Sequence, residues 1–324
     1  MPFLIGTDEA GYAPNLGPLV ISATVWEVPA DCSDDRLYKL LKKVVCNSAD
    51  RAGKKRVAWA DSKALYSPAV GLGVLERGVL AALALCAATP ADWRTLWQAL
   101  DPHLAGNLDA LPWHIGFNSP LPLAAALEDL ESLVPAVDAG MERAGVRLLA
   151  MYSRAVFPEQ FNHLAESHGN KAEVLSRLTL ELIAAAMARL PMNTGRQPVR
   201  IICDRHGGRC RYRPLVQRQF ADELVQVCHE SPSESAYAWG EGVNRVEIRF
   251  RVQGEEYLPV AVASMASKYL REAAMLAFNR FWCARVPELR PTAGYPLDAR
   301  RFKSEIEPAQ RALGLDDRVV WRNC

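Results

Sequence analysis

The sequence predicts an α/β fold, in which helices pack on a β-sheet core. Short apolar segments typical of buried strands occur at 3–7 and 199–203, and long amphipathic segments with helical spacing occur at 170–190 and 260–282. The chain has 324 residues, of which 50% are hydrophobic and 23% charged, a composition too apolar for a disordered protein. Because this length can bury a sizeable core, we expect a single domain over residues 1–324.

The expected strands are spread along the whole chain. Residues 3–7 end in a polar turn that starts at Asp8. Residues 19–28 alternate in hydropathy and are rich in β-branched side chains, so we expect them to pair with the first strand. Further strands are expected at 146–152, 199–203, 224–228 and 246–252.

Helices are expected between and after these strands. The spacing of apolar residues predicts helices at 34–45, 170–190, 260–282 and 299–313, and after 59–63. Residues 87–142 differ from the rest, because they are rich in Pro, Ala and Trp and are interrupted by prolines. We expect this segment to form helical pieces joined by turns, as an insertion in the main domain.

Composition excludes several classes of protein. Thirty-eight basic and 37 acidic residues leave a formal net charge of +1, so nucleic-acid binding would have to come from local basic surface. No apolar run reaches the roughly 18 to 20 residues that span a bilayer, and the N-terminus lacks the basic leader of a signal peptide, so no membrane partner is expected. The eight cysteines have no CxxC or zinc-finger spacing, and we interpret them as mostly buried thiols of a cytoplasmic protein.

Candidate functional acids follow two predicted strands. Asp8 and Glu9 are neighbours, and neighbours on a strand point to opposite faces unless the chain turns there, which Gly11 allows. Asp204 follows the strand at 199–203. Strand ends are where open α/β sheets usually place their sites, so all three acids are candidate site residues. Turn formation or helix capping is the alternative for each of them.

The helix expected at 260–282 carries a third candidate group. Ser264, Lys268 and Glu272 lie at i, i+4 and i+8, and Arg271 lies near the same helix face. On the functional interpretation Glu272 binds a metal, whereas Lys268 and Ser264 contact phosphate. A solvated helix face with a Lys–Glu pair is the alternative.

The chemistry of these acids favours particular metals. Carboxylates without accompanying His or Cys ligands favour Mg²⁺ or Mn²⁺ rather than zinc. A pair of such ions is the usual solution to phosphodiester hydrolysis, in which one activates water and the other stabilises the leaving oxygen.

Five segments resemble, in the same order, the motifs of the type 2 ribonucleases H, that is, ribonucleases HII and HIII. The segments are Asp8-Glu9-Ala10-Gly11 with Gly17-Pro18, Trp59-Ala60-Asp61-Ser62-Lys63, Ile201-Ile202-Cys203-Asp204, the helix from Val260 to Glu272, and Gly294-Tyr295-Pro296. Together they cover most of the chain. Residues 87–142 and 236–258 have no counterpart in the family.

The resemblance implies a ribonuclease H-like fold, with a mixed β-sheet flanked by helices and a C-terminal helical segment. It also implies an endonuclease with a two-metal-ion mechanism, using Mg²⁺ or Mn²⁺, that hydrolyses the RNA strand of RNA–DNA hybrids or ribonucleotides embedded in DNA. We expect it to act as a monomer. The implied catalytic and metal-binding acids are Asp8, Glu9, Asp204 and Glu272. The implied substrate contacts are Gly11, Tyr12, Ala13, Lys63, Ser264, Lys268 and Tyr295.

The chain departs from the ribonuclease HII pattern in the loop after the first acids and at the fourth acid. Ribonuclease HII has Gly-Arg-Gly in the loop that contacts the ribose 2′-hydroxyl, whereas this chain has Gly11, Tyr12 and Ala13. The fourth acid, Glu272, matches the Glu of ribonuclease HIII rather than the Asp of ribonuclease HII. The altered loop motivates an alternative function, a nucleic-acid-binding protein or nuclease on the same fold with a different substrate.

An arginine-rich stretch directly follows Asp204. It begins at Arg205 and includes four further arginines up to Arg218, so it is a candidate for phosphate contacts, with Arg205 as a predicted substrate contact. A solvated loop is the alternative. His206, two residues after Asp204, is interpreted either as a catalytic or as a structural residue. Trp239 is interpreted either as an exposed platform on which a base stacks or as a core residue.

A sugar-kinase or actin-like ATPase is a further alternative. The segment Ile5-Gly6-Thr7-Asp8 and the segment after Asp204 resemble the phosphate loops of that superfamily. The chain lacks a Gly-rich adenosine-binding segment near its C-terminus, which weighs against this alternative.

Overall fold

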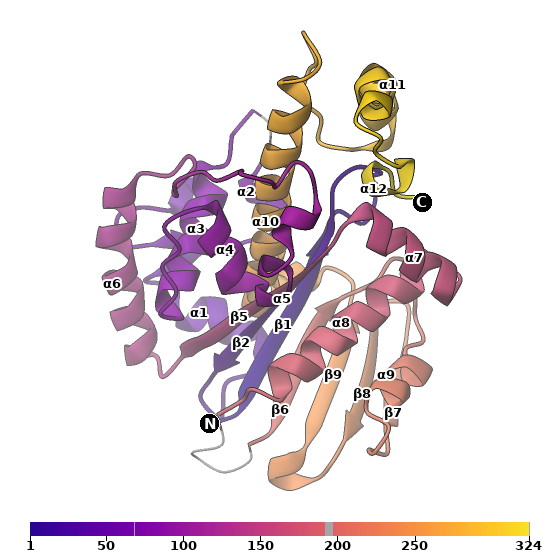
Figure 1. Cartoon of the computed structure of the whole chain (residues 1–324). Coiled ribbons are helices and arrows are strands. Elements are labelled where there is room, and N and C mark those ends of the chain that lie inside the picture. The colour runs from indigo at the N-terminus through magenta and orange to yellow at the C-terminus, as the bar shows by residue number, and fades with distance from the viewer. Residues whose placement is uncertain (68, 192–196, 324) are drawn as a thin grey trace.

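The computed structural model describes residues 1–67, 69–191 and 197–323, and it contains a seven-stranded mixed sheet with helices on both faces (Figure 1). The strand order across the sheet is β5(Arg147–Val156), β2(Leu19–Glu27), β1(Phe3–Ala10), β6(Val199–Asp204), β9(Val246–Arg251), β8(Glu234–Trp239) and β7(Gln226–Glu230). The pairs β1–β6 and β6–β9 are parallel, and the other four pairs are antiparallel. The predicted mixed sheet flanked by helices is confirmed.

The helices form two layers and a C-terminal group. They are α1(Leu37–Leu40), α2(Ser62–Leu65), α3(Gly73–Leu85), α4(Trp93–Leu100), α5(Pro102–Ala105), α6(Leu127–Arg143), α7(Pro158–His168), α8(Lys171–Met187), α9(Arg213–Gln219), α10(Leu258–Cys283), α11(Pro296–Ala312) and α12(Asp317–Val320). Helix α10 packs on one face of β1 and β2 with α3 beside it, and α8 packs on the other face (Figure 1). Helices α11 and α12 lie beyond the end of the sheet opposite the N-terminus.

The alternation of side chains along β1 explains the two layers. Leu4 packs into the core that contains α10, whereas Ile5 packs into the core that contains α8. Gly6 lets α10 approach the strand, because a Cβ there would lie 2.3 Å from the backbone carbon of Pro259. This contact brings the N-terminal half of α10 across the end of β1.

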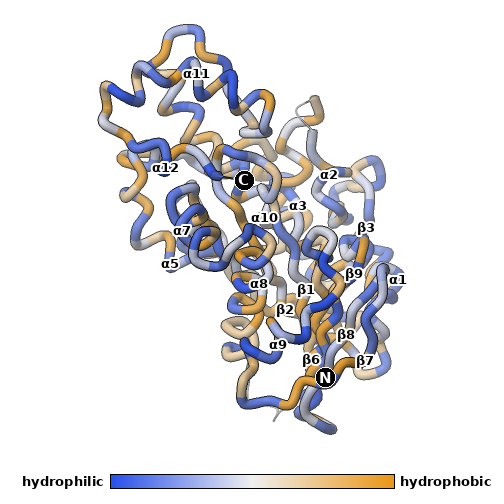
Figure 2. Tube along the Cα trace, turned by 90° about the vertical axis from the view of Figure 1, so that its right-hand side faces the viewer, coloured by the Kyte–Doolittle hydropathy of each residue, from blue (hydrophilic) through white to orange (hydrophobic). Residues whose placement is uncertain are grey.

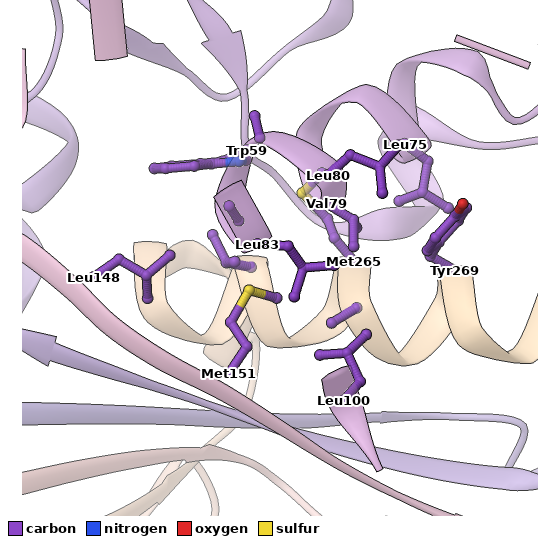
Figure 3. Close-up of a cluster of buried hydrophobic side chains, with 14 of the residues drawn as sticks. Trp59, Leu75, Val79, Leu80, Leu83, Leu100, Leu148, Met151, Met265 and Tyr269 are labelled. Atoms are coloured by element: carbon purple, nitrogen blue, oxygen red, sulfur yellow. The ribbon is translucent and has the colours of Figure 1, made fainter. Parts of the chain in front are cut away.

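The largest core lies between α10, α3 and the segment 87–142 (Figure 3). Met265 and Tyr269 of α10 meet Val79 of α3, and Leu100 of α4 belongs to the same buried cluster. The predicted helical pieces in this segment are confirmed as α4, α5 and α6. They share one apolar core with the helix that carries three of the candidate site residues.

Hydropathy follows this layering. In Figure 2 hydrophobic colours concentrate along the sheet strands, whereas α11 alternates between hydrophilic and hydrophobic residues. Over the described residues, no helix is long and apolar enough to cross a membrane. The cysteines among these residues are free thiols, and Cys32, Cys46 and Cys203 are buried, whereas Cys228 is exposed. The prediction of mostly buried thiols is therefore only partly met, and Cys324 lies outside the described residues.

Several elements differ from the predictions. The helix predicted at 34–45 is reduced to α1 and a preceding 3-10 turn, because residues 45–46 form β3(Val45–Cys46), which pairs with β4(Val57–Ala58). Strand β8 was not expected, since its residues from Ser235 to Trp239 are all buried and lack the alternation of a half-exposed strand. Helices α7 and α9 were not predicted either, and α9, with seven residues, is too short for a clear periodicity.

Candidate active site

The carboxyl ends of the parallel strands β1 and β6 place two acids side by side. Thr7 pairs with Cys203, so the next residues along these strands, Asp8 and Asp204, are neighbours on the same sheet face. Strand β1 continues through Ala10, which corrects the expectation that Asp8 starts a turn. The chain turns at Gly11, whose φ of 86° favours glycine.

Helix α10 crosses this strand end and adds its polar face. The hydroxyl of Ser267 donates a hydrogen bond of 3.0 Å to the backbone oxygen of Asp8. One turn earlier, the hydroxyl of Ser264 lies 3.1 Å from that of Ser62 at the start of α2. Helix α2 is capped by Asp61, whose carboxylate accepts from the backbone N–H of Lys63. The predicted segment around Lys63 is thereby brought to the predicted helix face.

These elements enclose a cavity of about 390 Å³. Its lining includes the predicted residues Asp8, Glu9, Gly11, Tyr12, Lys63, Asp204, Ser264, Lys268, Glu272 and Tyr295. It also includes residues that were not predicted as site residues, namely Ala10, Ser62, Tyr66, Ser67, Glu255, Arg271 and Ala293. Ala13 and Arg205 are not among the lining residues.

The acids at the strand ends repel one another, and Asp8 is buried whereas Glu9 and Asp204 are partly buried. Burial, followed by the charges of Glu9 and Asp204, raises the pKa of Asp8 well above its usual range. Burial and the charges of Asp204 and Glu255 raise the pKa of Glu9 to about 8. Burial and the charge of Glu255 raise the pKa of Asp204 to about 6. Three carboxyl groups are therefore concentrated at one end of the cavity, and Glu9 is mostly protonated near neutral pH in the metal-free protein.

Glu272 lines the same cavity but in a different electrostatic setting. Its carboxylate lies 2.5 Å from the Nζ of Lys268 and 3.8 Å from the guanidinium of Arg271. The hydroxyl of Tyr66 donates a further hydrogen bond of 2.9 Å to it. Lys268 Nζ also lies 4.6 Å from the centre of the Tyr66 ring. The Lys–Glu pair considered as the alternative for this helix face is present, and it lies inside the cavity.

Glu255 is an acid of this site that the sequence analysis missed. It belongs to a 3-10 turn, Gly254–Glu256, between β9 and α10. The N–H of Gly254 donates a 2.9 Å hydrogen bond to the carboxylate of Asp204, which fixes the turn against the strand end. The Nζ of Lys63, whose side chain is 81% exposed, lies 3.4 Å from Glu255. A Gly-Glu-Glu turn directly before the helix was the available signal, but only the fold brings it beside β6.

Arg205 and His206, two further candidates, make their contacts outside the cavity. The guanidinium of Arg205 donates to the backbone oxygens of Ser231, Pro232 and Arg209 rather than to the cavity. His206 is buried with its ring nitrogens beside hydroxyl groups of α8, and burial lowers its pKa to about 3.

The other aromatic and basic candidates are also committed to the protein's own structure. Trp239 is buried against Phe220, so it is not an exposed platform. Arg209 and Arg218 both pair with Glu173 of α8. Arg209 and Arg218 therefore connect the segment after β6 to helix α8. This corrects the prediction that these two arginines contact phosphate.

The donor set at the strand ends suits a hard divalent cation. Asp8, Glu9 and Asp204 offer carboxylate oxygens, the ligands that Mg²⁺ and Mn²⁺ prefer, and Glu272 lines the same cavity. Their mutual repulsion would be relieved by such a cation. In residues 1–67, 69–191 and 197–323, no three His, Cys, Asp or Glu side chains form a group that could hold a metal ion.

Comparison with known proteins gives matches among solved structures. No family model and no curated protein sequence matches the chain. The ribonuclease HII of Archaeoglobus fulgidus, from its complex with PCNA, is 17% identical with a TM-score of 0.43, over 99% of this chain and 94% of that chain. Ribonuclease H2 of Pyrococcus horikoshii is 16% identical with a TM-score of 0.41, over 98% of this chain and 92% of that chain.

A ribonuclease HIII, Bst-RNase HIII in complex with Mn²⁺, is 15% identical with a TM-score of 0.40, over 99% of this chain and 65% of that chain. These structures belong to the family that the sequence motifs resemble. At such identities and TM-scores, the similarity does not show what this chain binds or cleaves. The function is therefore inferred from the chain's own residues.

Proposed function

We propose that this protein is a metal-dependent endonuclease of the type 2 ribonuclease H kind. It would hydrolyse the RNA strand of RNA–DNA hybrids, or ribonucleotides embedded in DNA, to a 3′-hydroxyl and a 5′-phosphate. The observation that carries the proposal is the meeting of Asp8, Glu9 and Asp204 in one cavity with the polar face of α10. The alternative from the sequence, a protein on the same fold with another nucleic-acid substrate, uses the same cavity.

Four acids of the cavity would bind the metal ions. Asp8 and Asp204, on adjacent parallel strands, would flank them, and Glu9 and Glu272 would complete the ligand set. A pair of Mg²⁺ or Mn²⁺ ions bound there would supply an activated water and a stabilised leaving oxygen. Because the pKa of Glu9 is about 8, this carboxyl would release a proton when it binds a cation near neutral pH.

The cations and hydroxyls of the cavity would bind the substrate. Lys268 is held by Glu272 and faces the same space as Ser264, so the two suit a phosphate group. Lys63 has an exposed side chain that can follow a phosphate at the cavity mouth. Tyr295 is about half exposed at the rim, where its ring can contact a sugar or base.

The proposal is tested with a cleavage panel and one pair of variants. The panel contains an RNA–DNA hybrid, a duplex with one ribonucleotide, a DNA duplex and single strands, each with Mg²⁺ and with Mn²⁺. We expect cleavage of the ribonucleotide-containing duplexes by the wild type and its loss in Asp204→Asn. Asp109→Asn is the matched control, because Asp109 lies on the surface and pairs with Arg94.

Three outcomes decide between the candidate functions. Full activity of Asp204→Asn would refute the metal assignment. Cleavage restricted to substrates without ribonucleotides, or nucleic-acid binding without cleavage in either metal, would favour the alternative function. Stabilisation by ATP without any response to nucleic acid would favour the kinase-like alternative.

A further inference from the structure

The loop that follows the strand-end acids is held by the C-terminal end of the chain. Residues 11–16 leave β1 and cross the edge of the cavity, which Gly11 and Tyr12 line. Arg322 is completely buried, and its guanidinium donates hydrogen bonds to the backbone oxygens of both Gly11 and Pro14. More than 300 residues of chain separate these partners, so only the fold brings them together.

Backbone contacts reinforce this attachment. The N–H of Arg322 donates 2.8 Å to the oxygen of Asn15, and the Asn15 side chain donates 3.0 Å back to the oxygen of Arg322. Leu16 and Trp321 form an antiparallel bridge beside them. The last described residues of the chain therefore act as a short partner strand for the loop.

The C-terminal tail is itself fixed to a rigid element. Asn162 of α7 donates 2.8 Å to the oxygen of Trp321 and accepts from the N–H of Asn323. The guanidinium of Arg322 lies 4.9 Å from the ring centre of Phe161 on the same helix. Helix α7, the tail and the loop are thus connected by successive hydrogen bonds.

The orientation of the loop backbone follows from these contacts. In a trans peptide the C=O and the next N–H point in opposite directions. Because the Gly11 oxygen is directed at Arg322, the N–H of Tyr12 is directed away from Arg322. The same relation at Pro14 agrees with the N–H of Asn15, which donates 2.9 Å to the oxygen of Gly294.

We propose that Arg322 is a positioning residue for the substrate strand, because it sets the backbone of residues 11–14 at the cavity edge. The inference rests on the proposed function, since it assumes that a sugar–phosphate backbone occupies the cavity. A buried guanidinium needs hydrogen-bond partners, and charge-assisted bonds to carbonyl groups are among the stronger ones. Arg322 does not line the cavity, so its effect on the substrate passes through the loop.

The test compares Arg322→Ala and Arg322→Lys with Arg318→Ala. Arg318 is an exposed arginine of α12 that pairs with Glu166, so its variant controls for the loss of a C-terminal arginine. The measurements are amide hydrogen exchange over residues 11–16, kcat and KM on the cleaved duplex, and the shift in melting temperature on adding Mn²⁺. Millimolar guanidinium is added to each variant as a chemical rescue.

We expect Arg322→Ala to raise KM by about 10- to 100-fold, with a smaller change in kcat, because the loop is displaced while the acids stay in place. Exchange over residues 11–16 should increase, and the Mn²⁺-induced shift should match the wild type. Arg322→Lys should be intermediate, and guanidinium should lower the KM of Arg322→Ala. Exchange and KM equal to those of Arg318→Ala would overturn the proposal, as would loss of the Mn²⁺ shift together with the KM effect.

Two further outcomes are also decisive. If Arg322→Ala does not fold, Arg322→Lys gives the answer by the same measurements, because lysine keeps the charge but cannot bond both carbonyl groups in the same geometry. If the wild type cleaves no member of the panel, the proposed function fails. Hydrogen exchange over residues 11–16 and the Kd for the RNA–DNA hybrid then decide whether Arg322 positions the loop.

Discussion

At the scale of single residues, the cavity contains two different kinds of carboxylate. Asp8, Glu9 and Asp204 lie together at one end of the cavity, and their pKa values are raised by desolvation and mutual repulsion. Glu272 is instead neutralised by Lys268. Glu255 lies beside the first kind, and its charge is the largest electrostatic contribution that raises the pKa of Asp204. We therefore expect substitutions at the two kinds of acid to have different effects.

Glu255→Gln should weaken Mn²⁺ binding by about 10- to 100-fold, the range typical of residues that support metal ligands. The physical reason is that the variant removes the negative charge beside Asp204, together with the ion pair to Lys63. Isothermal titration calorimetry measures the affinity directly, without any assay of cleavage. Glu256→Gln is the control, since Glu256 is the adjacent, exposed residue. Equal affinities of the two variants would contradict the prediction.

Mn²⁺ affinity should rise with pH between about 6 and 8. The raised pKa of Glu9 means that the metal competes with a proton, and one displaced proton gives about a tenfold change per pH unit. The same shift makes the metal-free protein lose stability as pH rises from about 4.5 to about 8, because the folded state holds the proton more tightly than the unfolded state.

Calorimetric titrations in two buffers with different ionisation enthalpies count the protons released on Mn²⁺ binding. Glu9→Gln should release fewer protons than the wild type at pH 7. An affinity that does not depend on pH over this interval would be inconsistent with the buried, repelling acids.

At the scale of elements, α10 links the site to the segment 87–142 through a buried carboxylate. Glu76 of α3 is fully buried and accepts hydrogen bonds from the backbone N–H groups of Leu123, Ala124 and Ala125. The hydroxyl of Tyr269 on α10 donates a further bond of 2.7 Å to it. Through Glu76, the loop before α6 is therefore connected to Tyr269, which directly follows the site residue Lys268.

Glu76→Gln should lower the free energy of unfolding by about 2 to 3 kcal/mol, because an amide nitrogen would face buried N–H donors. Tyr269→Phe, which removes a single hydrogen bond, should cost about 1 kcal/mol. Denaturant unfolding measures both variants. If Glu76→Gln were no more damaging than Tyr269→Phe, the carboxylate would not be the main attachment of this loop.

At the scale of the whole molecule, residues from every part of the chain meet around the site. The acids come from β1 and β6, Lys63 from the segment before α3, and the loop support from the C-terminal tail. Trp97 of α4 is buried in the same apolar core as α10. That the chain unfolds as a single domain with residues 87–142 as an insertion stays a prediction.

Calorimetry should show one cooperative unfolding transition for the full chain. Trp97→Ala should lower its midpoint as a whole, at a cost of about 3 to 5 kcal/mol, because a large buried side chain leaves a cavity in a shared core. Trp321→Ala, at a partly exposed tryptophan of the C-terminal tail outside that core, is the comparison. A separate transition affected by Trp97→Ala alone would show that residues 87–142 fold independently.

Local patterns were sufficient for most long elements and for most of the acids. The helical face with Ser264, Lys268 and Glu272 follows from i, i+4 spacing, and that face does meet the cavity. The strand ending at Asp204 follows from a short apolar run. Short or fully buried elements such as β8 and α9 were missed, because their periodicity extends over too few residues or is hidden by burial.

By itself, the sequence determined the fold class and identified Asp8, Glu9, Asp204 and Glu272 among the residues that line the cavity, since hydropathy period and residue type are local properties. Only the tertiary structure decided that Glu255 joins the acids, that Arg205 turns away from the cavity, and that Arg322 holds the loop after Gly11. The physical reason is that the long-range hydrogen bonds of Arg205 and Arg322 join residues 26 to 311 positions apart, and only the folded chain brings such distant groups together.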